Sequence, residues 1–225
     1  MLEMDSHEDS DALLLPIAGA LRSSVALAER ADKEEAGIER EWIIDDECHA
    51  IEELLGLAFV VAQVQITRVI SHGKWLHKLH RNRTGNGSLL GVSDRKEDIL
   101  AVATARIGAV GHTAVEGINS FANYFKHRDE WPSDWNGFTR DLEKRTAEVI
   151  KAFGAKPGCT GNFRQGFEAI VGDHQYEDVT RLGLLVSGWE LSLKNAYEKE
   201  LLSGGWLQKR ASNQFISNTW ANRRP

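Results

Sequence analysis

The stretch EWIIDDECHAIEELLGLAFVVAQVQITRVISH, residues 41–72, decides the fold. Its apolar residues recur at steps of three and four, which is the spacing of one face of an amphipathic α-helix. These positions are Ile44, Cys48, Ile51, Leu55, Ala58, Ala62, Ile66 and Val69. The pattern predicts a long helix from Glu41 to about His72, where Gly73 permits a break.

A second long helix is predicted over residues 94–127. Asp94 and Glu97, three residues apart, match a capping box, in which side chains satisfy the free backbone N–H groups at a helix start. The apolar face of this helix holds Ile99, Ala103, Ile107, Val110, Ala114, Ile118, Phe121 and Phe125. Pro132 closes the region, because proline disfavours helical geometry in the residue before it.

Turn-forming segments separate the remaining predicted helices. The sequence RNRTGNGSLLG, residues 81–91, predicts a loop. After a further loop at 131–137 we expect helices at 139–153, 163–171 and 176–202. Neither β-alternation nor an internal repeat is present. The sequence therefore predicts an all-α protein, a bundle of four to five main helices.

The predicted bundle domain spans residues 41–202, with a peripheral segment at each end. Residues 1–40 are acidic, and we expect an exposed helix there that ends or bends near Gly37. Residues 203–225 are expected to form a tail that packs on the bundle or on a partner. Three large aromatic residues lie in this tail: Trp206, Phe215 and Trp220.

The composition is that of an ordinary globular protein. Of 225 residues, 42% are apolar and 27% charged, which is enough to bury a core. The two cysteines, Cys48 and Cys159, match no zinc spacing and are too few for a disulfide scaffold. The first apolar run follows acidic residues, unlike an export signal, and the longest, 54–66, is shorter than the ~20 residues that cross a bilayer. We expect a cytoplasmic protein without membrane contact.

Charge is distributed unevenly along the chain. Residues 1–50 carry 14 acidic and 4 basic side chains, whereas residues 51–93 carry 2 acidic and 5 basic ones. The basic residues crowd a predicted helix end around one aromatic side chain: Lys74, Trp75, Lys78, Arg81 and Arg83. Cations neutralise phosphates and an aromatic ring stacks on bases, so this cluster predicts RNA binding. The alternative is a solvated helix end with favourably placed positive charge.

A polar stripe lies opposite the apolar face of the predicted 94–127 helix. It consists of His112, Glu116, Asn119, Asn123 and His127. One interpretation is the solvent side of an amphipathic helix. Another follows from the short polar side chains, which suit close approach of a second helix with hydrogen bonds across the contact. The second interpretation predicts a homodimer.

The run Asn-Tyr-Phe-Lys-His-Arg-Asp-Glu-Trp, residues 123–131, resembles the signature of HEPN domains. That signature is an arginine followed by a polar residue and, four to six residues after the arginine, a histidine. Asn123 stands at the polar position and His127 at that of the histidine, but Ala122 occupies the place of the arginine.

A second frame, from Arg106 to His112, keeps the arginine and the histidine but has Ile107 at the polar position. The resemblance implies a bundle of four to five helices and a dimer in which the signature helices meet. It also implies RNA cleavage by arginine and histidine without a metal. Arg128 is the only nearby basic substitute for the missing arginine.

His127 also has a case of its own. It lies near a predicted helix C-terminus, where the helix dipole favours a protonated imidazole, and Asp129 and Glu130 favour it further. Such a histidine suits general acid or base catalysis at neutral pH. The alternative is a structural histidine that pairs with Asp129.

No metal or other cofactor is expected. Glu41, Asp45, His49 and Glu53 share one helical face, but the Glu-x-x-His pairs of di-iron bundles are missing. A phosphate-binding glycine loop and an HExxH motif are also missing.

These observations favour an HEPN-like protein that engages RNA, as a metal-independent endoribonuclease of a toxin or antiviral system. The predicted catalytic residues are His127, Asn123, Arg128 and His112. The alternative is a non-catalytic helical module for dimerisation or protein interaction, in which the same polar stripe specifies the partner.

Overall fold

The computed structural model describes residues 6–34, 36–85, 87–172 and 174–204. Within these ranges the chain forms seven α-helices and three short 3-10 helices, and it contains no strand, which confirms the all-α class. The number of helices exceeds the four to five expected. The elements are α1 (Ser6–Glu34), α2 (Gly37–Thr84), α3 (Lys96–Leu100), η1 (Gly108–Val110), α4 (Ala114–His127), η2 (Arg128–Glu130), η3 (Trp135–Gly137), α5 (Asp141–Ala152), α6 (Asn162–Val171) and α7 (Thr180–Ser203).

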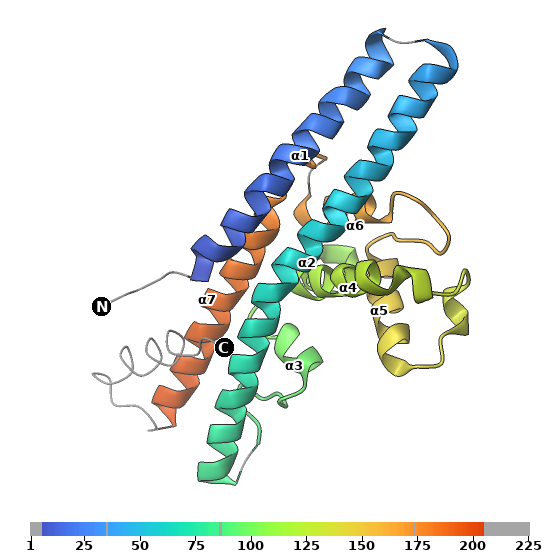
Figure 1. The fold of residues 1–225 in the computed structure, drawn as a ribbon. Helices are drawn as coiled ribbons and strands as arrows, with labels where there is room; N and C mark the ends of the chain where they lie inside the picture. The colour runs from blue at the N-terminus through green and yellow to red at the C-terminus, as the bar shows by residue number, and fades with distance from the viewer. Residues whose placement is uncertain (1–5, 35, 86, 173, 205–225) are drawn as a thin grey trace.

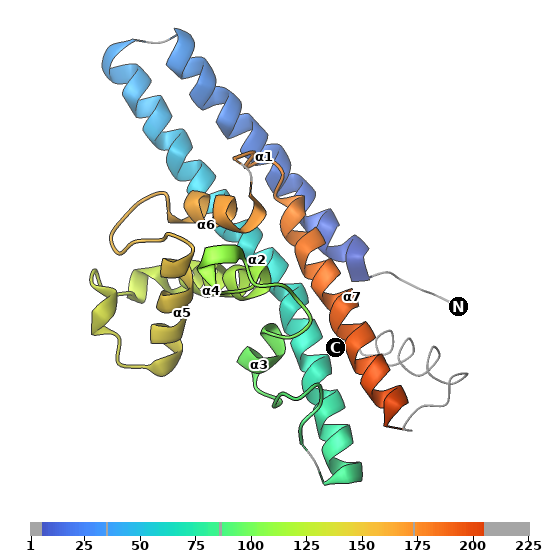
Figure 2. The same ribbon diagram turned by 180° about the vertical axis from the view of Figure 1, so that it is seen from behind.

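Three long helices form the frame of the molecule. Helices α1 and α7 run alongside α2, and the shorter helices α3 to α6 gather on one face of α2 (Figures 1 and 2). The turn between α1 and α2 lies at the far end of this frame, beyond the shorter helices. Leu14 and Leu21 of α1 are fully buried. The residues before position 41 thus supply part of the core.

Helix α2 continues through Gly73, where the sequence predicted a break. A Cβ atom at Gly73 would lie 3.1 Å from the Tyr197 hydroxyl and 3.4 Å from Ile99. The glycine therefore permits close packing of α7 and α3 against α2. The helix ends where Gly85, in the left-handed region at φ 73°, donates its N–H to the Arg81 carbonyl.

The prediction of one helix over residues 94–127 is wrong. Helix α3 ends at Leu100 and α4 begins at Ala114. The segment between them turns through Ala103 at φ 62° and Gly111 at φ 73°. The indole N–H of Trp189 donates to the Val102 carbonyl at 3.0 Å, which holds this segment against α7.

The capping box belongs to Thr113 and Glu116. The Thr113 hydroxyl accepts the Glu116 backbone N–H at 3.1 Å, and the Glu116 carboxylate accepts the Thr113 N–H at 2.7 Å. The predicted box residue Asp94 instead accepts a hydrogen bond from Arg81 at 2.7 Å. Helix α3 begins without a side-chain cap.

The other helix predictions agree with the structure within a few residues. Helices α5, α6 and α7 correspond to the predicted 139–153, 163–171 and 176–202. The predicted tail beyond Gly204 lies outside the described residues.

Two glycines allow α4 to pack tightly between its neighbours. A Cβ atom at Gly56 of α2 would lie 2.0 Å from the Phe125 ring, and one at Gly166 of α6 would lie 2.2 Å from Phe121. Phe121 also stacks on Phe59, with ring centroids 5.1 Å apart. These contacts fix the crossing of α4 over α2, on which the candidate site depends.

By length and apolar composition, two segments could span a bilayer: Ala12–Glu34 and Gly37–Thr84. Core helices of soluble proteins meet the same criterion. The most apolar window of the second segment is 56% buried inside the protein, and that of the first is 28% buried. The cytoplasmic location and the absence of membrane contact stay predictions.

Candidate nucleic-acid interface

The crossing of α2 and α4 is held by a polar network around Gln63. The side-chain amide of Gln63 donates to the Asn119 carboxamide oxygen at 2.9 Å and to that of Asn123 at 2.8 Å. Gln63 and Asn119 are buried, so each hydrogen bond replaces one lost to water. Both asparagines of the predicted stripe are therefore hydrogen-bonded within the chain. The homodimer expected from the stripe stays a prediction.

Lys126 completes this network. Its ammonium donates to the Gln63 side-chain oxygen at 2.7 Å, which directs the lysine along the surface of α2. Partial burial lowers the pKa of Lys126, because water is replaced by less polar surroundings that disfavour the charged form.

Lys96, the first residue of α3, lies close to Lys126. The side chain of Lys96 is partly buried, and burial lowers its pKa first. The positive charge of Lys126 lowers the pKa of Lys96 further, Glu97 acts in the opposite direction, and Lys74 of α2 adds to the lowering. Lys96 of α3 is thus within electrostatic range of Lys126 on α4 and of Lys74 on α2. We call these three residues the lysine cluster: Lys74, Lys96 and Lys126.

The lysine cluster has no carboxylate partner among the described residues. No ion pair within 4.0 Å is formed by any of its three members in that part of the chain, whereas many other cations of the protein are paired. The nearest acid in sequence, Glu97, pairs with Arg145 of α5 at 3.3 Å. Like charges at close range repel, so an anion that bound there would relieve a cost already present in the fold.

Of the predicted nucleic-acid residues, Lys74 belongs to the cluster and Lys78 is exposed one turn further along α2. Arg81 pairs with Asp94 at 2.7 Å, and Arg83 is exposed at the end of α2. Trp75 is partly buried against the core, with its ring 5.4 Å from that of His72. Trp75 therefore packs against the core, and its ring is less open to stacking by an RNA base than the sequence predicted.

The predicted catalytic histidines lie at opposite ends of α4. His112 precedes the first turn and its Nδ1 lies 3.7 Å from Glu116, while His127 is the last helical residue and its Nδ1 lies 3.4 Å from Glu130. A helix of 14 residues is about 21 Å long. One chain therefore does not unite the two imidazoles.

The other two predicted catalytic residues are engaged structurally. Asn123 accepts the hydrogen bond from Gln63. Arg128 pairs with Glu53 of α2 at 2.6 Å and lies over the Phe125 ring, 4.9 Å from its centre. His127 is left as an exposed histidine beside Glu130, a pairing that differs from the predicted one with Asp129.

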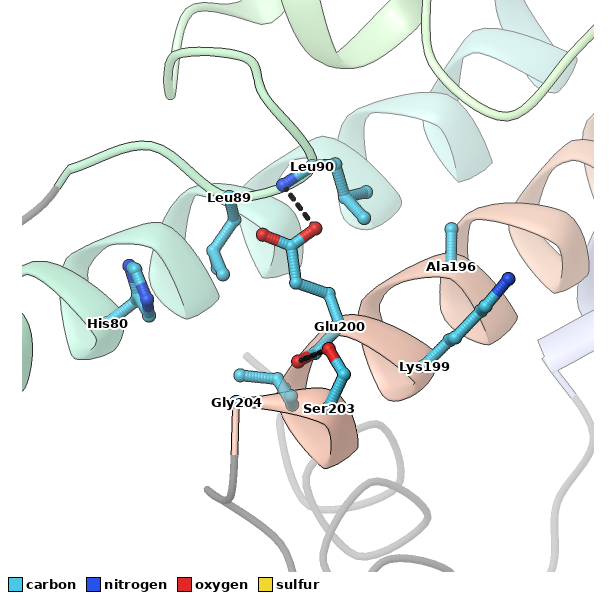
Figure 3. A pocket seen from close by; sticks show the side chains of 9 residues that line it. His80, Leu89, Leu90, Ala196, Lys199, Glu200, Ser203 and Gly204 are labelled. Carbon is cyan, nitrogen blue, oxygen red and sulfur yellow. Dashed lines mark hydrogen bonds between the residues drawn. The ribbon is translucent and has the colours of Figure 1, made fainter.

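A recess of about 540 Å³ lies between the C-terminal ends of α2 and α7. Figure 3 shows the side chains that line it. Its lining includes His80, Lys199 and Glu200. The Glu200 carboxylate accepts the Leu90 N–H at 2.9 Å (Figure 3). This carboxylate therefore holds the turn at residues 89–90 against α7. Among the described residues, no group of three or more histidine, cysteine or acidic side chains could hold a metal ion.

Sequence reasoning missed Lys96, Lys126 and Gln63. Lys126 lies within the stretch that resembles the HEPN signature, but a single lysine on a predicted helix carries no spacing signal. The three cluster residues come from three elements, and their meeting depends on the crossing of α4 over α2.

Comparisons with protein-family models, with curated proteins and with solved structures gave no significant match. The resemblance to HEPN domains therefore depends on the stretch from Asn123 to His127 and on the all-α fold.

Proposed function

We propose that this protein is a non-catalytic, HEPN-like helical protein that binds RNA through the lysine cluster. The observation that supports this best is the convergence of Lys74, Lys96 and Lys126 from three helices without a carboxylate partner in the described chain. Lys74 and Lys126 are exposed and Lys96 is partly buried, so the three positive charges can be reached by an anion from solvent. A phosphate backbone supplies the missing negative charge.

A polymer fits this surface better than a single small anion does. From residue 66 to residue 84, α2 carries five basic residues and no acidic one. The positive charge therefore extends along the helix beyond the lysine cluster. Extended positive surfaces follow the regular charge of a nucleic-acid backbone.

The geometry of α4 favours binding over cleavage. A ribonuclease that works without metal needs an acid or base with a second group placed at the same phosphate. In the part of the chain that the structure describes, His127 pairs with Glu130, whereas Arg128 pairs with Glu53 and Asn123 with Gln63. These contacts support a protein that binds RNA without cleaving it over a ribonuclease.

The test is RNA binding by Lys74→Glu, measured by fluorescence anisotropy with a single-stranded RNA of about 20 nucleotides. Lys74 is exposed and makes no contact that holds the fold, so the variant should fold normally. We expect about a 10-fold loss of affinity and a salt dependence of log Kd that is shallower by about one unit.

Lys33→Glu is the matched control, because Lys33 is an exposed lysine near the C-terminal end of α1, beside the start of α2 and far from Lys74 along that helix. It should bind RNA nearly as tightly as wild type. If wild type fails to bind RNA at low salt, or if both variants lose affinity equally, the assignment of the lysine cluster is wrong. Cleavage of the probe by wild type without metal would instead favour the ribonuclease.

A further inference from the structure

Among the described residues, the face of α2 opposite its buried side is exposed to solvent. In Figure 1 α2 crosses in front of α4, and in the reverse view of Figure 2 α4 lies in front of α2. Six exposed residues follow this face at steps of seven and four, which keep them within an arc of about 60°. We call them the outer row: Asp46, Glu53, Leu57, Val64, Ser71 and Lys78.

The outer row is divided by charge. Its N-terminal end is acidic, with Asp46 and Glu53, and its C-terminal end is basic, with Lys78. Between these ends, the residues Leu57 and Val64 are 43% and 47% exposed. The centre of the row is therefore apolar and open to solvent. Glu53 is 52% exposed although it pairs with Arg128. The pattern from one end to the other is acidic, apolar and basic.

We propose that the outer row is the interface of a homodimer in which two α2 helices pack antiparallel. A two-fold axis between Leu57 and Val64 would place the acidic end of each helix beside the basic end of the other and join the two apolar centres. Parallel pairing would oppose like charges, so the charge order selects the antiparallel arrangement. The seven-residue step of the row is also the repeat at which two helices keep one seam in contact.

The size of the row sets the expected affinity. From Asp46 to Lys78 the helix rises about 48 Å, and a helix with its side chains is about 10 Å wide. The strip therefore covers about 500 Å² per chain, or about 1,000 Å² in total, which is the lower bound for a specific interface. We expect a dimer that forms at micromolar concentration. The two proposals share Lys78, which belongs both to the outer row and to the basic stretch of α2, whereas Lys74 of the lysine cluster lies to the side of the row.

Sedimentation velocity over a range of micromolar concentrations tests the proposal, with Leu57→Arg as the disrupting variant. Leu184→Arg is its matched control, because Leu184 is an exposed leucine, at 63%, on the long helix α7. Both residues face solvent, so neither change should unfold the chain. Wild type and Leu184→Arg should dimerise, and Leu57→Arg should raise the dissociation constant at least about 10-fold.

Charge exchange tests the antiparallel orientation. Asp46→Lys and Lys78→Glu should each weaken the dimer several-fold, and the double variant should recover most of the loss because opposite charges again face each other. A monomeric wild type, a Leu57→Arg variant that still dimerises, or a double variant weaker than both single ones would each overturn the proposal. A monomer that floats with neutral phosphatidylcholine vesicles would overturn it in favour of a lipid-facing row.

Discussion

Two charged clusters beside α2 are built in opposite ways. Glu52 is buried, and its carboxylate accepts the backbone N–H groups of Phe163 and Arg164 at 3.0 and 3.1 Å and the Arg164 side chain at 3.0 Å. It satisfies the first turn of α6, where N–H groups have no partner within the helix. The lysine cluster, by contrast, gathers charge of one sign with no carboxylate partner in the described chain. The first cluster stabilises the fold, and the second is suited to bind an anion.

Among the variants that test this comparison, Glu52→Ala should have the largest effect on stability. Removing the carboxylate leaves Arg164 and the first turn of α6 without partners, so we expect a loss of about 3 kcal/mol in the free energy of unfolding. For a chain of this size, the melting temperature should fall by roughly 6–12 °C. Differential scanning calorimetry measures both quantities.

The neighbouring residue provides the control. Glu53 is 52% exposed and its ion pair with Arg128 lies at the surface, so Glu53→Ala should cost about 1 kcal/mol or less. Equal losses in the two variants would show that burial does not distinguish these carboxylates, and the comparison would then fail.

Lys96→Met should change stability in the other direction. The pKa of Lys96 is lowered in the folded state, so the charged form opposes folding at every pH below that lowered value. The penalty fades as pH rises from the folded pKa toward the unfolded value of about 10.4. At neutral pH we expect Lys96→Met to stabilise the protein by on the order of 0.5–1 kcal/mol.

The same variant should weaken RNA binding, which separates a functional charge from a structural one. Lys33→Met, at an exposed position near the C-terminal end of α1, should change neither the melting temperature nor RNA affinity by much. Thermal unfolding at neutral and alkaline pH, together with RNA titrations, measures both effects. Destabilisation by Lys96→Met at neutral pH would mean that the lysine supports the fold, as Glu52 does.

The extent to which the sequence predicted these features depends on where each signal lies. The helices at 141–152, 162–171 and 180–203 were predicted closely, because their apolar period is bounded by turn-forming residues on both sides. In the sequence Glu52 stands next to Glu53 in a predicted amphipathic helix, so it is interpreted as a second solvent-facing acid. Its burial depends on α6, which lies over a hundred residues away.

The predicted 94–127 helix failed for a local reason. Asp94 with Glu97 and Thr113 with Glu116 have the same capping spacing, and only the second pair forms the box. Ile107 and Val110 fit a helical period but pack against the core from a turn and a 3-10 helix. Gly111, which adopts a left-handed conformation directly before the true start, was the available signal.

The lysine cluster was predicted only at Lys74. Its other members are separated along the chain from one another and from Lys74, and no spacing predicts that they meet. Their approach follows from packing at Gly56 and from the Gln63 network, which position α4 on α2. Helical periodicity predicts where a helix lies in the sequence, but it does not predict which helices cross in space.

The smallest effect on stability is expected from His127→Ala. The imidazole is 55% exposed and its contact with Glu130 lies at the surface, so its loss should cost no more than about 0.5 kcal/mol. Because His127 belongs to neither charged cluster, RNA affinity should also stay close to wild type. Wild type should show no cleavage of RNA above a protein-free blank in a chelator, since within the described ranges the ion-pair partner of His127 is Glu130 and the nearby Arg128 and Asn123 are engaged with α2. If wild type does cleave RNA under these conditions and His127→Ala lowers the rate by about 10² to 10⁴, His127 is a general acid or base. The second catalytic group must then come from another chain. RNA binding by the lysine cluster would in that case be only part of the protein's function.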